Sequence, residues 1–212
     1  MVCSLGCEGA YRSMVTKRYL DAQTLLEDGW HLGAQVLASG FWPDFIVAIW
    51  RGGVPMGVAV QEFLKAYGVD ADHIAIRTAS YQGIDDQSSV RVYGLSYLVS
   101  RVTHEAKLLI VDDVFDTGHS VDAVIRELSL RARKNMPEDI RIAVPYHKPT
   151  RNQTPRVPAY VLHETEAWLK YPHSLEGLTL EEMRAHRPQL AQIIEQARAS
   201  EPEPVETREE RA

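Results

Sequence analysis

The sequence predicts an α/β fold in three layers, in which helices flank both faces of a parallel sheet. Short runs of strand length alternate along the chain with longer segments of helical spacing, and this alternation is typical of successive βα units. Residues 45–50 and 108–111 are apolar without interruption, as in strands that are buried on both faces. With 212 residues, 45% of them hydrophobic, the chain is long enough to bury one sizeable core.

Each element is predicted from its own pattern. Helices are expected where apolar residues recur at spacings of three and four, or where a proline suits a first helical turn, at residues 19–38, about 55–67 and 121–133. Strands are expected where short runs are apolar or alternate, at residues 45–50, 73–78, 108–111, 139–145 and 159–163, the last strand of the sheet. Residues 79–89 are polar and lack a helical period, so we expect a long loop there.

One strand–loop–helix unit, residues 107–133, carries the strongest functional signal. Asp112 and Asp113 close its strand, at the carboxyl edge where open α/β sheets bind their ligands. The loop that follows combines a glycine, two hydroxyl side chains and the first N–H groups of a helix, which suits a phosphate. The two carboxylates suit sugar hydroxyls or a hard cation such as Mg2+. The expected ligand therefore has both a phosphate and a hydroxylated, metal-chelating part.

This unit, VDDVFDTGHS, resembles the phosphoribosyl-pyrophosphate (PRPP) binding motif of the type I phosphoribosyltransferases at every position. The resemblance implies the fold of that family, with a small hood, and Mg2+ as cofactor with Asp113 as a metal ligand. It assigns PRPP binding to the acid pair and the loop after it, that is to Asp112, Asp113, Asp116, Thr117, Gly118, His119 and Ser120.

Two other segments resemble parts of the same family. Arg51-Gly52-Gly53 is similar to the loop that meets the leaving pyrophosphate. Ser80-Tyr81 corresponds to a Ser-Tyr pair on a mobile loop that closes over PRPP during catalysis. Some relatives carry a lysine just before this pair, where this sequence has Ala79, and Arg77 is the candidate to replace its contact with pyrophosphate.

The C-terminal third resembles the 6-oxopurine branch of the family, namely the xanthine–guanine and hypoxanthine enzymes. Lys148-Pro149 matches the lysine that donates to the purine O6, and Trp168-Leu169 matches the pair that covers the ring. The resemblance implies transfer of phosphoribosyl from PRPP to N9 of hypoxanthine, guanine or xanthine, with Asp116 as general base at N7. Two alternatives stay open: another base as acceptor, or a non-catalytic regulator that senses PRPP.

Composition limits the partners. A net charge of −6 argues against nucleic-acid binding, and no apolar stretch is long enough to span a membrane. No signal peptide is evident, so we expect a cytoplasmic protein. The two cysteines, Cys3 and Cys7, form no disulfide framework and are interpreted as incidental thiols. The expected partners are PRPP, a purine base and, by resemblance to the family, further copies of the chain in a homodimer or homotetramer.

Four segments are expected along the chain. Residues 1–16 form an N-terminal arm for which disorder is one interpretation, and residues 17–173 form the phosphoribosyltransferase domain. Residues 174–200 form a helical extension, because Thr179 and Glu182 have capping-box spacing and Pro188 opens a second helical pattern. Residues 201–212 form a disordered acidic tail.

Overall fold

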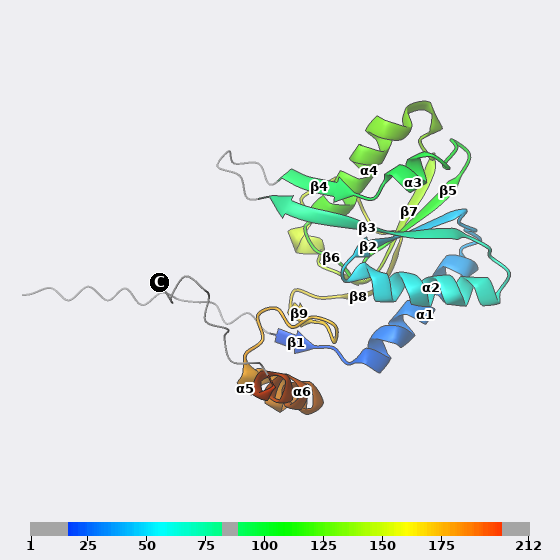
Figure 1. Ribbon diagram of the computed structural model, residues 1–212. Helices are drawn as coiled ribbons and strands as arrows, with labels where there is room; N and C mark the ends of the chain where they lie inside the picture. The colour runs from blue at the N-terminus through cyan, green and yellow to red at the C-terminus, as the bar shows by residue number, and fades with distance from the viewer. Residues whose placement is uncertain (1–16, 82–88, 201–212) are drawn as a thin grey trace, which may run out of the picture. The chain divides into compact units, whose positions relative to one another are not determined.

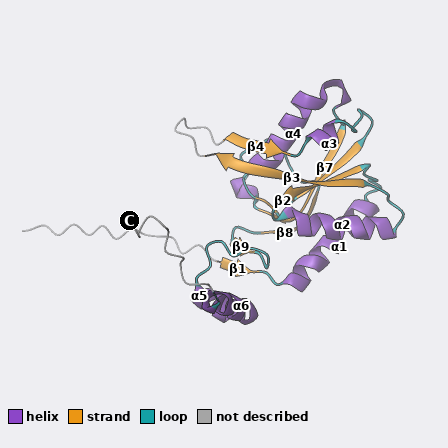
Figure 2. Ribbon diagram, in the orientation of Figure 1, coloured by secondary structure: helices purple, strands orange, loops and turns teal. Residues whose placement is uncertain are grey.

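The computed structural model describes residues 17–81 and 89–200, and it has the α/β architecture that the sequence predicts (Figure 1). The chain divides into two compact units, residues 1–172 and residues 173–212. Figure 2 shows most strands of the first unit gathered into one twisted sheet with helices outside it. Within the described residues, no helix has both the length and the apolar character needed to cross a membrane.

The central sheet has seven strands in the order β4-β3-β2-β5-β7-β6, with β8 also paired to β7. Its strands are β2 (Phe45–Trp50), β3 (Asp72–Tyr81), β4 (Ser89–Tyr93), β5 (Lys107–Val111), β6 (Val114–Phe115), β7 (Asp139–His147) and β8 (Tyr160–Glu164). Every pair in the sheet is parallel except β3–β4. The carboxyl ends of β2 and β5 are therefore neighbours, which brings together the two turns that the sequence singles out.

Helices cover both faces of the sheet (Figure 1). α1 (Ala22–Ala38) and α2 (Gly53–Ala66) lie on one face, and α3 (Ser96–Val99) and α4 (His119–Ala132) lie on the other. Strand residues alternate between the two faces: Ile46 belongs to the core under α1 and α2, and the next residue, Val47, belongs to the core under α4. Because both faces of β2 are covered by helices, residues 45–50 are apolar without interruption.

The loop expected at residues 79–89 is shorter than predicted. β3 continues to Tyr81 and β4 begins at Ser89, and the two strands pair as an antiparallel hairpin with Ser80 opposite Val90. The prediction was wrong at both ends because the hairpin is held by backbone hydrogen bonds, which polar residues form as well as apolar ones. The middle of the expected loop, residues 82–88, lies outside the described residues.

Residues 159–163 do not end the strand succession, as the sequence analysis expected. A further strand, β9 (Trp168–Lys170), pairs in parallel with β1 (Lys17–Tyr19) to form a small separate sheet. β1 takes up the start of the helix predicted over residues 19–38, and α1 begins only after Asp21, whose side chain accepts a hydrogen bond from the Thr24 N–H (2.9 Å). Three-residue strands from opposite ends of the chain leave no local periodicity to detect.

Residues 173–200 form two helices, α5 (Leu180–His186) and α6 (Pro188–Ala199), which confirms the helical end of the chain. The Thr179 hydroxyl accepts from the Glu182 N–H (3.1 Å), and the Glu182 carboxylate accepts from the Thr179 N–H (2.9 Å), so the capping box is complete. Pro188 stands at the first position of α6, where its missing N–H does no harm. The arm at residues 1–16, with both cysteines, and the tail at 201–212 lie outside the described residues.

The contact between α1 and α2 generates the first testable prediction. A Cβ at Gly29 of α1 would lie 2.5 Å from the Ala59 Cβ of α2, so alanine does not fit there. We expect Gly29→Ala to lower the free energy of unfolding by about 1–2 kcal/mol, because overpacking outweighs the better helix propensity of alanine. Urea denaturation measures the change. His31→Ala, at an exposed position of the same helix, is the control, and a Gly29→Ala protein as stable as this control would contradict the close packing.

Candidate active site

A buried carboxylate, that of Asp112, and a half-buried one, that of Asp113, stand at the carboxyl end of β5. Asp112 is 9% exposed, and its carboxylate accepts a hydrogen bond from the Asp113 N–H (2.9 Å). Burial raises the pKa of Asp112 well above its usual value, and repulsion from Asp113 adds to this effect. Burial likewise raises the pKa of Asp113, to about 6. A cation, or the hydroxyl donors of a ligand, would therefore stabilise the charged forms of these two acids.

The turn after β2 lies directly against this acid pair. A Cβ on Gly52 would overlap the Asp113 carboxylate, and a Cβ on Gly53 would lie 2.6 Å from the Val111 carbonyl oxygen. Only glycine lets the backbone approach the carboxylates this closely. The Trp50–Arg51 peptide bond at the start of the turn is cis. Arg51 and Gly52 border the pocket beside the acids, whereas Gly53 serves the close approach and does not line that pocket.

The loop between β6 and α4 forms the floor of the pocket. Gly118 has a φ of 81°, a left-handed conformation that side chains rarely adopt, and a Cβ there would lie 2.5 Å from the Thr154 hydroxyl. α4 begins at the next residue, so its first N–H groups open toward the loop. The pocket measures about 260 Å3 and is lined by the turn after β2, by Thr78 and by the whole segment from Asp112 to Val121.

A lysine and a tryptophan lie next to this loop. Lys148, 3% exposed, follows β7, and its Nζ donates to the Asp116 carboxylate over 3.1 Å. The same Nζ lies 5.5 Å from the centroid of the Trp168 ring on β9, and that ring is 47% exposed. Leu169 points the other way, into the core. A carboxylate, an ammonium group and an aromatic ring thus come together from three distant parts of the sequence.

Sequence reasoning missed a second cation on Asp116. The Nε of Arg151 lies 2.6 Å from the Asp116 carboxylate, so this acid has both Lys148 and Arg151 as ion-pair partners. The 3-10 turn η2 (Pro149–Arg151) returns the chain toward Lys148 and brings Arg151 to the site. A second basic residue three positions after Lys148, beyond Pro149, was the available signal.

Tyr171, also absent from the predicted site residues, links β9 to the acid pair. Its hydroxyl donates to the Asp113 carbonyl oxygen over 2.9 Å. Burial raises the pKa of Tyr171, and the nearby Asp113 and Asp112 raise it further, so the phenol stays protonated and remains a donor. The small β1–β9 sheet is therefore fastened to the residues that follow β5.

The remaining predicted residues lie around the pocket or beyond it. His119 is at the start of α4, and its Nε2 is 3.0 Å from the Gln153 side-chain oxygen. Arg77 is on β3 but does not line the pocket, and its guanidinium lies 5.4 Å from the centroid of the Tyr93 ring. Ser80 and Tyr81 end β3, and their side chains lie outside the described part of the structure.

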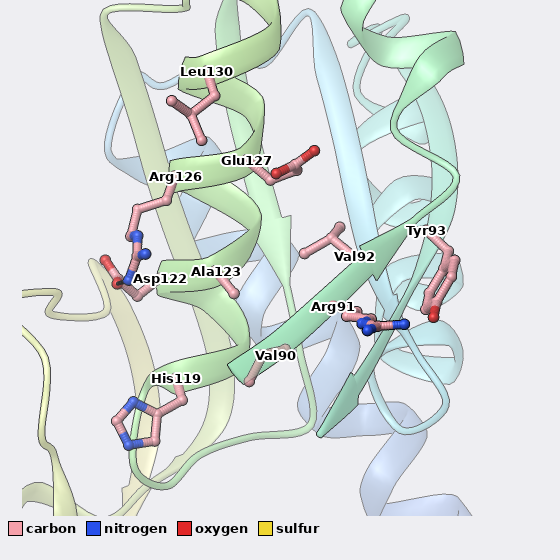
Figure 3. Close-up of a pocket in the computed structure, with 10 residues that line it drawn as sticks. All are labelled: Val90, Arg91, Val92, Tyr93, His119, Asp122, Ala123, Arg126, Glu127 and Leu130. Carbon is pink, nitrogen blue, oxygen red and sulfur yellow. Dashed lines mark ion pairs between the residues drawn. The ribbon is translucent and has the colours of Figure 1, made fainter. Parts of the chain in front are cut away.

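A separate groove runs between β4 and α4 (Figure 3). It measures about 490 Å3 and meets the pocket only at His119, which lines both. Val92 points toward α4, whereas Arg91 and Tyr93 point to the other side of the strand (Figure 3). Since the groove contains neither the acid pair nor the phosphate-binding loop, we assign the chemistry to the smaller pocket.

The acid pair fits a divalent cation that arrives with its ligand. Among residues 17–81 and 89–200, no three His, Cys, Asp or Glu side chains gather into a metal cage. Mg2+ is commonly bound by one or two protein carboxylates together with substrate phosphates and water. Asp112 and Asp113 supply that number of carboxylates. A cation bound by them would offset the free-energy cost of burying their negative charges.

The fold and the pocket define an α/β protein with a pocket at the carboxyl edge of a parallel sheet, whose carboxylates, hydroxyls and helix N–H groups suit a phosphorylated, hydroxylated ligand. Comparison with protein families makes this specific: residues 15–182 match the model of the phosphoribosyl transferase domain. The chain therefore belongs to the phosphoribosyl transferase family and is a phosphoribosyltransferase enzyme. Among curated proteins, none matches the sequence.

Solved structures share the fold over most of the chain. A purine phosphoribosyltransferase from Pyrococcus horikoshii Ot3 is 25% identical, with a TM-score of 0.59 over 77% of this chain and 97% of its own. The xanthine-guanine-hypoxanthine phosphoribosyltransferase of Helicobacter pylori is 20% identical, with a TM-score of 0.58 over 80% and 99%. A hypothetical protein from Neisseria gonorrhoeae with bound ppGpp is 20% identical, with a TM-score of 0.66 over 85% and 98%.

The raised pKa values of the acid pair predict how stability depends on pH. Between 3.8, the ordinary value, and about 6, the folded chain holds a proton on Asp113 that the unfolded chain has lost. The free energy of unfolding therefore falls as the pH rises through this window. We expect Asp113→Asn to raise it by roughly 1–3 kcal/mol at pH 7.5, and by much less near pH 4.

Urea denaturation of both proteins at the two pH values measures this difference. Asp70→Asn, at an exposed position, is the matched control and should change neither value. An Asp113→Asn protein that is less stable than the parent at pH 7.5 would show that the charged carboxylate does not destabilise the folded chain.

Proposed function

We propose that this phosphoribosyltransferase transfers the 5-phosphoribosyl group of PRPP to N9 of a 6-oxopurine and releases pyrophosphate. The observation that supports this choice of acceptor is the side-by-side arrangement of Lys148 and Asp116, whose Nζ and carboxylate oxygen are 3.1 Å apart. A 6-oxopurine carries an acceptor at O6 next to N7 on one edge of its ring. The lysine donor and the carboxylate acceptor match that edge when N7 carries the proton.

The phosphate end of PRPP occupies the loop from Asp116 to Ser120. There the N–H groups at the start of α4 and the hydroxyls of Thr117 and Ser120 supply donors without adding negative charge. The ribose hydroxyls donate to Asp112 and Asp113. Mg2+, when bound with the substrate at these carboxylates, would neutralise charge on the pyrophosphate.

The pyrophosphate leaves beside the turn after β2. Arg51 lines the pocket there and offers a planar group of N–H donors suited to phosphate oxygens. The neighbouring Gly52 has no side chain that could block the approach. As the bond to pyrophosphate breaks, positive charge develops on the ribosyl carbon, and the carboxylates beside the pocket stabilise it.

The base lies against Trp168 and is oriented by Lys148. Stacking on an aromatic side chain is worth about 1–3 kcal/mol in nucleic-acid complexes and tolerates any base, so it does not select among purines. Selection comes from the lysine, which is a donor only and favours a 6-oxo over a 6-amino group. As N9 attacks the ribosyl carbon, Asp116 accepts the proton that leaves N7.

Two finer points stay predictions. One is the homodimer or homotetramer expected from the family, which sedimentation analysis would test. The other is an acceptor outside the 6-oxopurines, which no contact in the described site favours. Because the chain is a phosphoribosyltransferase enzyme, the alternative of a non-catalytic PRPP sensor is set aside.

The role of Asp116 is tested by Asp116→Asn. General base catalysis contributes about 10²–10⁴-fold, so we expect kcat with hypoxanthine to fall by about that factor, while KM for PRPP changes little. Steady-state assays with PRPP and Mg2+ measure both constants. Asp139→Asn, at the amino end of β7, is the control and should keep the parent activity. An Asp116→Asn enzyme within about threefold of the parent kcat would exclude the carboxylate as the base.

The role of Lys148 predicts discrimination against adenine. We expect hypoxanthine, guanine or xanthine to react at least about 100-fold better than adenine in kcat/KM, because the 6-amino group of adenine offers no acceptor to the lysine. Lys148→Met should lower kcat/KM for the 6-oxopurines about 10- to 100-fold and narrow the gap to adenine. A parent enzyme that uses adenine as well as the oxopurines would refute the proposed acceptor.

A further inference from the structure

A third strand contributes one residue to the pocket, Thr78 of β3. The other residues that line the pocket come from the end of β2 and its turn, or from the segment between Asp112 and Val121. In the parallel pairing of β2 with β3, Trp50 stands beside Arg77, so Thr78 follows at the level of Arg51. Because β2 lies between β3 and β5 in the sheet, the half-buried Thr78 and the acid pair stand on opposite sides of the turn after β2.

The pairing of β3 with β4 gives the direction of the Thr78 side chain. Thr78 is directly opposite Val92, and residues that are directly opposite in an antiparallel pair project from the same face of the sheet. Val92 points toward α4 (Figure 3), so Thr78 projects toward the side on which α4 begins beside the pocket. Its two neighbours project from the other face, and one of them, Arg77, has its guanidinium 5.4 Å from the centroid of the Tyr93 ring. Of these three residues, Thr78 is the one that reaches the pocket.

The Thr78 hydroxyl is available to a ligand. Within residues 17–81 and 89–200, no side chain or backbone group forms a hydrogen bond with it. Threonine hydroxyls that hold the fold together do have partners: that of Thr154 donates to the Asn152 side-chain oxygen (3.1 Å), and that of Thr179 accepts from the Glu182 N–H (3.1 Å). A hydroxyl hydrogen rotates to suit its acceptor, so a ligand oxygen in the pocket can receive it.

We propose that the Thr78 hydroxyl donates a hydrogen bond to the pyrophosphate of PRPP, an inference that rests on the proposed function. The pyrophosphate is proposed to lie beside Arg51, and Thr78 stands at the level of that residue on the neighbouring strand and lines the same pocket. The sequence analysis assigned the pyrophosphate contact of β3 to Arg77. Because the Arg77 side chain projects from the other face, the contact passes to the next residue along the strand.

Thr78→Val tests the contact, because valine keeps the branched shape that suits a strand and lacks the hydroxyl. Calorimetric titration of the full chain, with Mg2+ present, measures the Kd of PRPP, and displacement of PRPP measures the Kd of ribose 5-phosphate. Both ligands carry the ribose and the 5-phosphate, and only PRPP carries the pyrophosphate. We expect Thr78→Val to raise the Kd of PRPP about 10-fold, because a hydrogen bond to a charged group is lost, and to leave that of ribose 5-phosphate within about twofold.

Two further variants separate this contact from stability. Thr78→Ser keeps a hydroxyl and should keep the Kd of PRPP within about threefold of the parent value. Thr103→Val removes an exposed hydroxyl in the connection before β5, at the other end of the sheet, and should leave both Kd values unchanged. A merely structural effect of Thr78→Val would weaken PRPP and ribose 5-phosphate together.

The outcomes distinguish this inference from the proposed function. If Thr78→Val leaves the Kd of PRPP unchanged, the hydroxyl does not contact the substrate, while the proposed function stands. If it weakens both ligands equally, the contact with the pyrophosphate is refuted, because the change then acts on the shared part of the ligands or on the pocket as a whole. If the parent chain binds no PRPP, the proposed function itself fails, and the role of Thr78 falls with it.

Discussion

The close contact between the acid pair and the turn after β2 is the constraint on which the site depends. Parallel pairing of β2 with β5 makes their carboxyl ends neighbours, and Gly52 and Gly53 let one backbone lie against the carboxylates of the other. The burial that results raises the pKa of both acids, so the folded chain disfavours the charged form of each. A ligand that brings a cation or hydroxyl donors would stabilise the charged forms, and acids with raised pKa values are typical of functional sites.

The proposed base-binding end of the site differs from the acid pair, because it combines groups of opposite charge. Asp116 stands between Lys148 and Arg151, and the lysine also lies near the Trp168 ring. In the absence of a ligand these charges satisfy one another, so the proposed base would have to replace an ion pair with contacts of equal strength. A planar ring with a donor and an acceptor on one edge can do this, and a generic hydrophobic ligand cannot.

The sequence predicted what is local and missed what depends on distant pairing. The strand at 45–50 appears at its expected bounds and a helix begins at Pro188 as expected, because apolar runs and residues typical of helix starts carry their own signal. β1 and β9 were missed, because a three-residue strand acquires its hydrogen bonds from the other end of the chain. Within the site, the motif indicated the acids and the loop. Arg151 was missed because a 3-10 turn brings it to Asp116, and Tyr171 was missed because its hydroxyl donates to a backbone carbonyl oxygen.

The two-residue period of β9 bears on which sequence changes this strand can accept. Trp168 is 47% exposed on one face of β9, whereas Leu169, the next residue, enters the core on the other face. A single inserted or deleted residue would instead exchange the two faces and bury the tryptophan's position in the core. A substitution at position 168 therefore changes the exposed face of the strand alone, whereas a change in strand length would also displace the core residue beside it.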